Sequence, residues 1–186
     1  MKRIVSLLLA LTLVFALASC GAGNDLSTYQ NAISATNPSS VTVTTKLVAG
    51  DVELNGSYDI TYADGAATVV YEYEKLNLDF EGDMVKTESG TSTVAADGTA
   101  TGVDAAVTSA AKLAIKLDTS KIKSVVEARG ILTCEILAAN TAAVLGFAVD
   151  ADVSLELRVT ADGKVGSASL AYTTDAGAHT IVCTFD

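Results

Sequence analysis

The sequence predicts a mainly β domain of the α+β class, in which a curved antiparallel sheet, or half-barrel, is closed by two short helices. Three observations support this. Apolar and polar residues alternate over long stretches, Asp-Gly pairs separate those stretches, and helical spacing is confined to two short segments. Alternation with a period of two is typical of strands with one buried and one solvated face. A sheet with one apolar face needs a cover, which the two helices supply.

The two helices are expected over about 26–35 and 137–145. In the first, Ser27 followed three positions later by Gln30 forms a capping-box pattern. This helix stops ahead of Pro38, because the residue before a proline is pushed out of the helical region. The second is followed by a glycine, which is a favoured C-terminal cap.

The clearest strand spans 51–62, where every odd position is polar and every even position is apolar, aromatic or glycine. Asp64-Gly65 then supplies the residues of a tight hairpin turn. The returning strand, 67–76, places Tyr71 and Tyr73 on one face and glutamates on the other.

The C-terminal part of the chain repeats this pattern. Turns at Asp162-Gly163 and Asp175-Ala176-Gly177 separate three short strands, which together predict a meander. The Ala/Thr/Gly-rich stretch 89–111 is expected to form weak strands around a mobile loop. Three further segments are expected to be strands: Val41–Val43, Leu113–Leu117 and Ile131–Ile136.

The first 19 residues are interpreted as a signal peptide. Lys2 and Arg3 precede an apolar run from Ile4 to Ala18. That run is shorter than the roughly 20 apolar residues that a spanning helix needs, and it ends in small residues, as a processed signal does.

The residues around Cys20 resemble the bacterial lipobox, since Leu17, Ala18 and Ser19 precede it and Gly21 follows. The resemblance implies cleavage of the Ser19–Cys20 bond, a diacylglyceryl group on Cys20, and a lipidated tether over 20–25. Two acyl chains bury enough methylenes, at about 0.8 kcal/mol each, for stable anchoring. The domain, 26–186, would then lie on the extracytoplasmic face of the cell membrane. The alternatives are an ordinary secretory signal with an incidental cysteine and a short buried helix.

Charge disfavours two classes of partner. Loss of the signal peptide removes Lys2 and Arg3 and leaves 10 basic against 22 acidic residues, a net charge of −12. This balance argues against nucleic acid and against direct docking on anionic headgroups.

Few residues point to catalysis, so we expect a non-enzymatic protein with no cofactor. His179 is the single histidine, and the chain has no recognised nucleophile, phosphate or zinc motif. Residues 51–62 begin like a calcium loop, but Tyr62 stands where a bidentate glutamate is required, so no metal site is expected. Glu72 and Glu74 are expected to be solvated on the wet face of the sheet.

The overall layout resembles a known fold. A lipid-tethered chain begins with a short helix and continues with paired strands reading GSYDITYADGAATVVYEYEKLN, and a second helix precedes the hairpin VSLELRVTADGKVGSASLAYTT. This is similar to the outer-membrane lipoprotein carrier (LolA-like) fold and to the lipid-carrying lipoproteins of mycobacterial type. The resemblance covers most of 26–186 and rests on pattern. It implies an apolar ligand or lipid held inside a half-barrel.

The apolar face of the predicted hairpin supplies the candidate ligand-lining residues: Val52, Leu54, Tyr58, Ile60, Tyr71 and Tyr73. The competing interpretation is an ordinary core filled by side chains of the helices. The alternative function is a protein–protein binding module of the cell envelope, and an enzyme of unrecognised type is a third class. Cys134 and Cys183 could form a disulfide after export, although free buried thiols are favoured.

Overall fold

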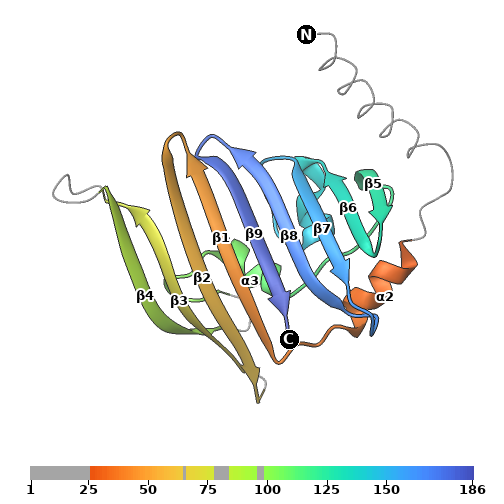
Figure 1. Ribbon diagram of the computed structural model, residues 1–186, viewed down its shortest axis with the longest axis horizontal. Coiled ribbons are helices and arrows are strands. Elements are labelled where there is room, and N and C mark those ends of the chain that lie inside the picture. The colour runs from red at the N-terminus through yellow and green to blue at the C-terminus, as the bar shows by residue number, and fades with distance from the viewer. Residues whose placement is uncertain (1–25, 65, 78–83, 96–98) are drawn as a thin grey trace, which may run out of the picture.

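The computed structural model describes residues 26–64, 66–77, 84–95 and 99–186, and it is built around one curved, open antiparallel sheet (Figure 1). Its nine strands lie in the order β4-β3-β2-β1-β9-β8-β7-β6-β5. The mainly β fold class predicted from the sequence is confirmed. The signal peptide, Ser19, Cys20 and the tether lie outside the described residues, as does Gly65 of the first predicted turn.

The elements follow in chain order. They are α2 (Ser27–Ala35), β1 (Ser40–Ala49), β2 (Val52–Ala63), β3 (Ala66–Leu76), β4 (Val85–Val94), α3 (Ala105–Ala111), β5 (Ile122–Ala128), β6 (Ile131–Ile136), a 3-10 turn (Ala138–Asn140), α4 (Thr141–Leu145), β7 (Val153–Val159), β8 (Val165–Thr174) and β9 (Gly177–Phe185).

The predicted alternation is present in β2. Every odd residue of this strand is exposed, and every even residue is half-buried or buried. In the β2–β3 hairpin Tyr58 stands opposite Tyr71, so both rings lie on the concave face. Asp64 adopts a positive φ of 52° in the connecting turn, as a tight hairpin requires.

The centre of the sheet joins the two ends of the chain. Strand β1 pairs with β9 in antiparallel register from Val41 opposite Phe185 to Val48 opposite Ala178. Strands β2–β4 therefore lie on one side of this pair and strands β5–β8 on the other. Alternation assigns a residue to a face but does not specify its partner strand, so the sequence did not predict this pairing.

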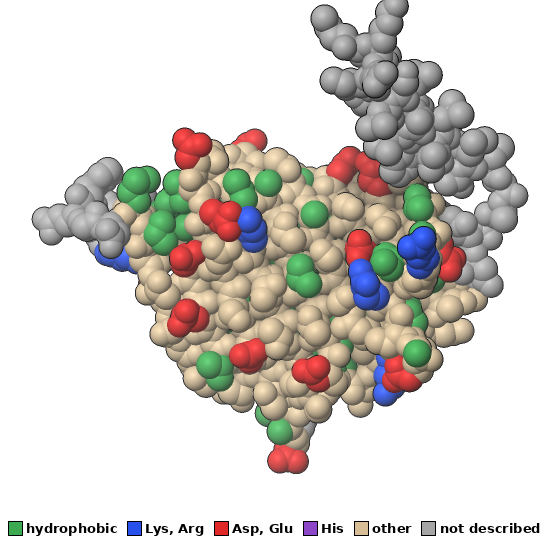
Figure 2. All heavy atoms as spheres, viewed as in Figure 1, with side chains coloured by type: hydrophobic (Ala, Val, Ile, Leu, Met, Phe, Trp, Pro, Cys, Tyr) green, Lys and Arg blue, Asp and Glu red, His purple; other side chains and the backbone are tan. Residues whose placement is uncertain are grey.

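The helices cover the concave face. Helix α3 packs against β1 and β9, and α2 packs against β7 and β8. Tyr29 of α2 and Val107 of α3 are almost fully buried, together with the inward residues of the central strands. The opposite, convex face carries scattered acidic and basic side chains (Figure 2). The described core thus lies between the sheet and its helices.

The predicted strand over Leu113–Leu117 is wrong. Leu113 has a positive φ of 49°, and no residue of the segment joins the sheet. Leu113 and Ile115 are nonetheless buried while Ala114 between them is exposed. The segment packs on the sheet without joining it. Its residues are alternately buried and exposed, as in a strand, but it makes no strand-to-strand hydrogen bonds.

The prediction of two helices is also incomplete. Within 89–111, residues 89–94 belong to β4 as expected, but Ala105–Ala111 forms α3. Its signal is Asp104, whose side chain accepts a 2.8 Å hydrogen bond from the Ala106 N–H as the N-cap. Strand β5 (Ile122–Ala128) was not predicted either.

The capping box at the first helix is wrong, although the helix itself is present. Its N-cap residue is Leu26, which makes no side-chain cap hydrogen bond. The Gln30 side chain instead accepts a 2.9 Å hydrogen bond from the Leu117 N–H and lies 3.4 Å from the Ile115 carbonyl, to which it donates. Gln30 therefore ties α2 to the crossing segment.

The second predicted helix is confirmed as a 3-10 turn followed by α4. It ends at Gly146, whose φ of 82° is the left-handed conformation expected of a C-terminal glycine. Ile131–Ile136 forms β6, and the three C-terminal strands form the predicted meander.

The two internal cysteines are free and buried. Cys134 lies on β6 and Cys183 on β9, with β7 and β8 between them. Three strand spacings of about 4.8 Å separate them by roughly 14 Å, twice the reach of a disulfide. The favoured interpretation as thiols is confirmed.

Candidate functional site

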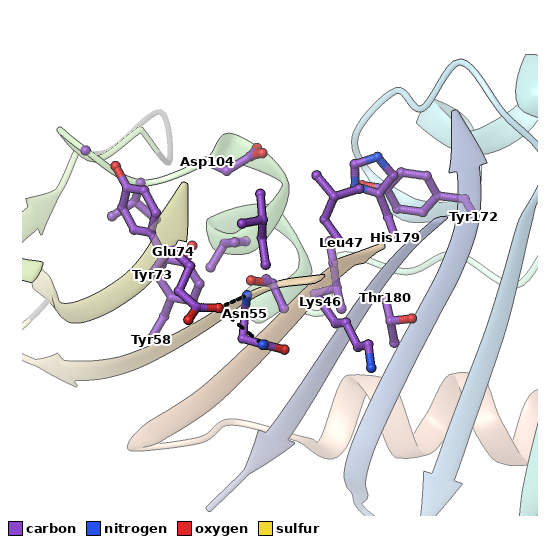
Figure 3. Close-up of a pocket in the computed structure, with 16 residues that line it drawn as sticks. Lys46, Leu47, Asn55, Tyr58, Tyr73, Glu74, Asp104, Tyr172, His179 and Thr180 are labelled. Carbon is purple, nitrogen blue, oxygen red and sulfur yellow. Dashed lines mark hydrogen bonds between the residues drawn. The ribbon is translucent and has the colours of Figure 1, made fainter. Parts of the chain in front are cut away.

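The concave face carries a pocket of about 450 Å³ at the end of the sheet where β1 turns into β2 (Figure 3). Pockets of about 300–1,000 Å³ are the usual size for small-molecule sites. We call it the tyrosine pocket. Its lining residues come from β1, β2, β3, β8, β9, α3 and the segment leading into α3: Thr45, Lys46, Leu47, Leu54, Asn55, Tyr58, Tyr73, Glu74, Gly102, Val103, Asp104, Val107, Tyr172, His179, Thr180 and Ile181.

One wall of the pocket is a row of stacked tyrosine rings. The ring centroids of Tyr58 and Tyr73 are 6.3 Å apart with planes 15° from parallel, and those of Tyr71 and Tyr73 are 5.9 Å apart at 29°. The Tyr73 hydroxyl donates a 2.5 Å hydrogen bond to Glu88. This bond, followed by burial, raises the pKa of Tyr73 to about 12. The row is thus fixed in position at its β4 side.

Glycines make room for these rings. A Cβ atom on Gly56 would lie 2.6 Å from Thr45 Oγ1 and 2.9 Å from the Tyr58 ring. Gly90 and Gly102 approach Tyr71 in the same way, each so close that a Cβ would come within 2.7 Å of its hydroxyl oxygen. Glycine inside a strand marks such close approaches. The tyrosine row therefore depends on residues that have no side chain.

The opposite wall comes from the C-terminal meander. The Tyr172 and His179 rings stack with centroids 4.8 Å apart and planes 9° from parallel. His179 Nε2 lies 3.0 Å from Thr174 Oγ1. The two rings face Tyr58 and Tyr73 across the pocket, with Asp104 between the two sides (Figure 3). His179 is thus part of an aromatic wall.

The mouth of the pocket lies where β2 and β3 separate. Their register ends with Gly56 opposite Tyr73. Beyond that pair the Glu74 carboxylate bridges the gap by accepting hydrogen bonds from the Asn55 backbone N–H at 2.8 Å and from its side-chain amide at 3.2 Å. Glu74, predicted to be merely solvated, therefore holds the two strands together at the mouth.

The pocket gathers some of the predicted lining residues. Leu54, Tyr58 and Tyr73 line it. Ile60 is 1 % exposed and lines a second pocket of about 650 Å³ near Pro38, beyond α3. Val52 and Tyr71 line neither pocket, although Tyr71 supports the ring row from behind.

Sequence reasoning missed the wall formed by Leu47, Asp104, Val107 and Tyr172. These residues reach the hairpin only through the β1–β9 pairing and through α3. Asp104, an N-cap residue type before an Ala-rich segment, was the one feature of the sequence that could have indicated α3 and thus this wall.

Much of the concave face is nevertheless filled. Val41, Val43 and Ile60 are at most 1 % exposed beneath α3. The competing interpretation of an ordinary core therefore describes the middle of the face, where the helices pack. The tyrosine pocket is the part of the face near the β1–β2 turn that they leave open.

The pocket can hold an apolar body with polar groups at its edge. Burial raises the pKa of both Tyr58 and Tyr172, and in each case the nearby Asp104 carboxylate raises it further. Among the described residues, no group of three or more His, Cys, Asp or Glu side chains is arranged to hold a metal ion. No helix within the described ranges is long and apolar enough to cross a membrane.

Comparison with known proteins places the chain in no group. No protein-family model matches the sequence, and no curated protein matches it. The function must therefore be argued from the site itself.

Proposed function

We propose that this protein is a non-enzymatic lipoprotein, anchored through Cys20 on the extracytoplasmic face of the cell membrane, whose domain binds an apolar ligand such as a lipid. The observation that carries the proposal is the tyrosine pocket, an open apolar hollow on the concave side of a curved sheet. Its size is typical of small-molecule sites, and its lining combines aliphatic and aromatic side chains with seven polar ones. The resemblance to lipoprotein carriers supports the same function.

Large exposed hydrophobic side chains of the described residues do not gather around the pocket itself. Among them, Val48 and Leu76 lie at the same end of the sheet but on its convex face, which Val70 also occupies. The edge strand β4 is rich in serine and threonine, so an apolar edge for a protein partner is less well supported.

The ligand is tested by native mass spectrometry and solvent extraction of the full chain in nanodiscs and of span 26–186. This span contains every described strand and helix. We expect a stoichiometric apolar molecule in both preparations. Tyr73→Glu should abolish its retention, because a carboxylate would be buried in the apolar wall. Val70→Glu is the matched control, since Val70 lies on the convex face of the same strand and is 53 % exposed. Two empty, stably folded preparations that also take up no added lipid would contradict the proposal.

The anchor is tested separately by metabolic labelling with palmitate. The wild-type chain should incorporate label and run as the processed form, whereas Cys20→Ala should do neither, because only the thiol can form the thioether. Equal labelling of the two chains would exclude Cys20 as the lipidated residue.

A further inference from the structure

The polar groups around the tyrosine pocket carry information about the head group of its ligand. Two carboxylates, Asp104 and Glu74, border the pocket on different sides. The one lysine among its lining residues, Lys46, is already paired with Glu53 at 2.7 Å. The remaining polar side chains at the walls are hydroxyls, an amide and an imidazole. The described lining thus offers anionic and neutral groups, with its cation already compensated.

Asp104 is held in place by the start of α3. One of its oxygens caps the helix through the Ala106 N–H at 2.8 Å, which fixes the side chain between the two walls. Its charge acts on both walls, since it contributes to the raised pKa of Tyr58 on one side and of Tyr172 on the other. A head group lying between these rings therefore lies in a negative potential.

Glu74 lies at the β2–β3 gap, on the side of β3 that alternation turns away from the Tyr73 ring, so it acts on the pocket less directly than Asp104. Its carboxylate accepts hydrogen bonds from neutral Asn55 groups, which stabilise the charge without cancelling it. The whole chain carries a formal net charge of −10, so no long-range attraction for anions offsets these two groups. An anionic ligand head between the two walls would therefore meet the like charge of Asp104.

From this arrangement we propose that the ligand is an amphiphile whose head group is cationic or an uncharged hydrogen-bond donor, such as an alkyl ammonium or a lipid hydroxyl, and that carboxylate-headed lipids are rejected. The inference rests on the proposed function, because it specifies the ligand of the same pocket. The hydroxyl or ammonium would donate to Asp104, and the chain would lie against the tyrosine row. The exposed Asp104 carboxylate attracts a cationic head group and repels an anionic one. Together these two effects are expected to separate the affinities for amine and acid by about tenfold.

The test compares dodecylamine, dodecanol and dodecanoate, which share one chain and differ in the head. Binding to span 26–186 is followed by tyrosine fluorescence, and photoreactive analogues check the result on the full chain in nanodiscs. We expect dodecylamine and dodecanol to bind about tenfold more tightly than dodecanoate. Asp104→Asn should narrow the gap in affinity between amine and acid and change dodecanol binding less than amine binding, because asparagine keeps the N-cap and loses the charge. Asp150→Asn, which changes the net charge equally away from the pocket, should alter nothing.

The outcomes separate the two proposals. Equal affinity for the three probes, or a preference for dodecanoate, would overturn the head-group inference and leave the proposed function standing. No binding of any probe would count against the proposed function itself. A salt titration of the wild type supplies a second measurement if Asp104→Asn fails to fold. The preference for amine over acid should then fall as ionic strength rises, and a preference indifferent to salt would overturn the inference.

Discussion

At the scale of single residues, the site depends on a glycine. Gly56 lies on the concave face of β2, where the Tyr58 ring folds over it. A glycine has no side chain that could indicate burial. Position 56 was therefore assigned to the apolar face only from the alternation of its neighbours. Only the three-dimensional contacts show that an absent side chain makes room for the ring.

Gly56→Ala should therefore destabilise the protein. Its Cβ would clash with Thr45 Oγ1 and the Tyr58 ring, and such overpacking costs about 1–3 kcal/mol. Urea unfolding measures the change. Ser57→Ala on the exposed face of the same strand is the control and should shift the free energy of unfolding by less than about 0.5 kcal/mol. A Gly56→Ala variant as stable as wild type would show that the ring has room to move.

The Tyr73–Glu88 hydrogen bond predicts a pH dependence. Lys75 and then Tyr73 lower the pKa of the Glu88 carboxyl, so the stability from this shift is present at neutral pH and lost as pH falls through the folded-state pKa. The pKa of Tyr73 is raised from 10.0 to about 12. The stability that this shift contributes is therefore fully present below pH 10.0 and is lost as pH rises through about 12.

Tyr73→Phe should consequently be less stable than wild type at neutral pH, and the difference should shrink in acid. Chemical unfolding across the acidic range checks this. In a Glu88→Gln background the acid dependence of the difference should vanish. A difference that stays constant into strong acid would show that the hydroxyl contributes through another partner.

At the scale of elements, the sequence predicted what local patterns encode and missed what contacts decide. The β2–β3 hairpin and the β7–β9 meander follow from alternation with Asp-Gly turns, because both signals are local. Helix α3 was missed because small Ala, Thr and Ser side chains give no strong period. The segment 113–117 was called a strand because burial alternates there, although a period of two records which side faces the core and not whether a neighbour is bonded.

Gln30 tests whether that crossing segment is held by α2. Gln30→Ala would leave the half-buried Leu117 N–H without its acceptor, at a cost of about 1–3 kcal/mol. Asn31→Ala, an exposed neighbour on the same helix, should be nearly neutral. Thermal or urea unfolding of the pair decides the matter. Equal stabilities would mean that water replaces the glutamine.

At the scale of the whole molecule, the two thiols report on the integrity of the core. Burial raises the pKa of Cys134 to about 11 and that of Cys183 to about 12. Because the thiolate is the reactive form, both should resist an aromatic disulfide reagent in the native protein and react on unfolding. The measurement is the rate of labelling with and without urea. Rapid native labelling would indicate that the sheet opens between its two halves.

Pairing of β1 with β9 also constrains the order in which the protein can form. A chain synthesised from its N-terminus completes β1 to β4 long before β9, and contacts so distant in sequence are slow to form. Until then the inner edge of β1 has no neighbour, and the two halves of the sheet are separate. Strand β9, residues 177–185, therefore joins the two halves of the sheet last. A chain interrupted before them would leave the β1 edge unpaired, exposed to proteases and to pairing with other copies of the chain.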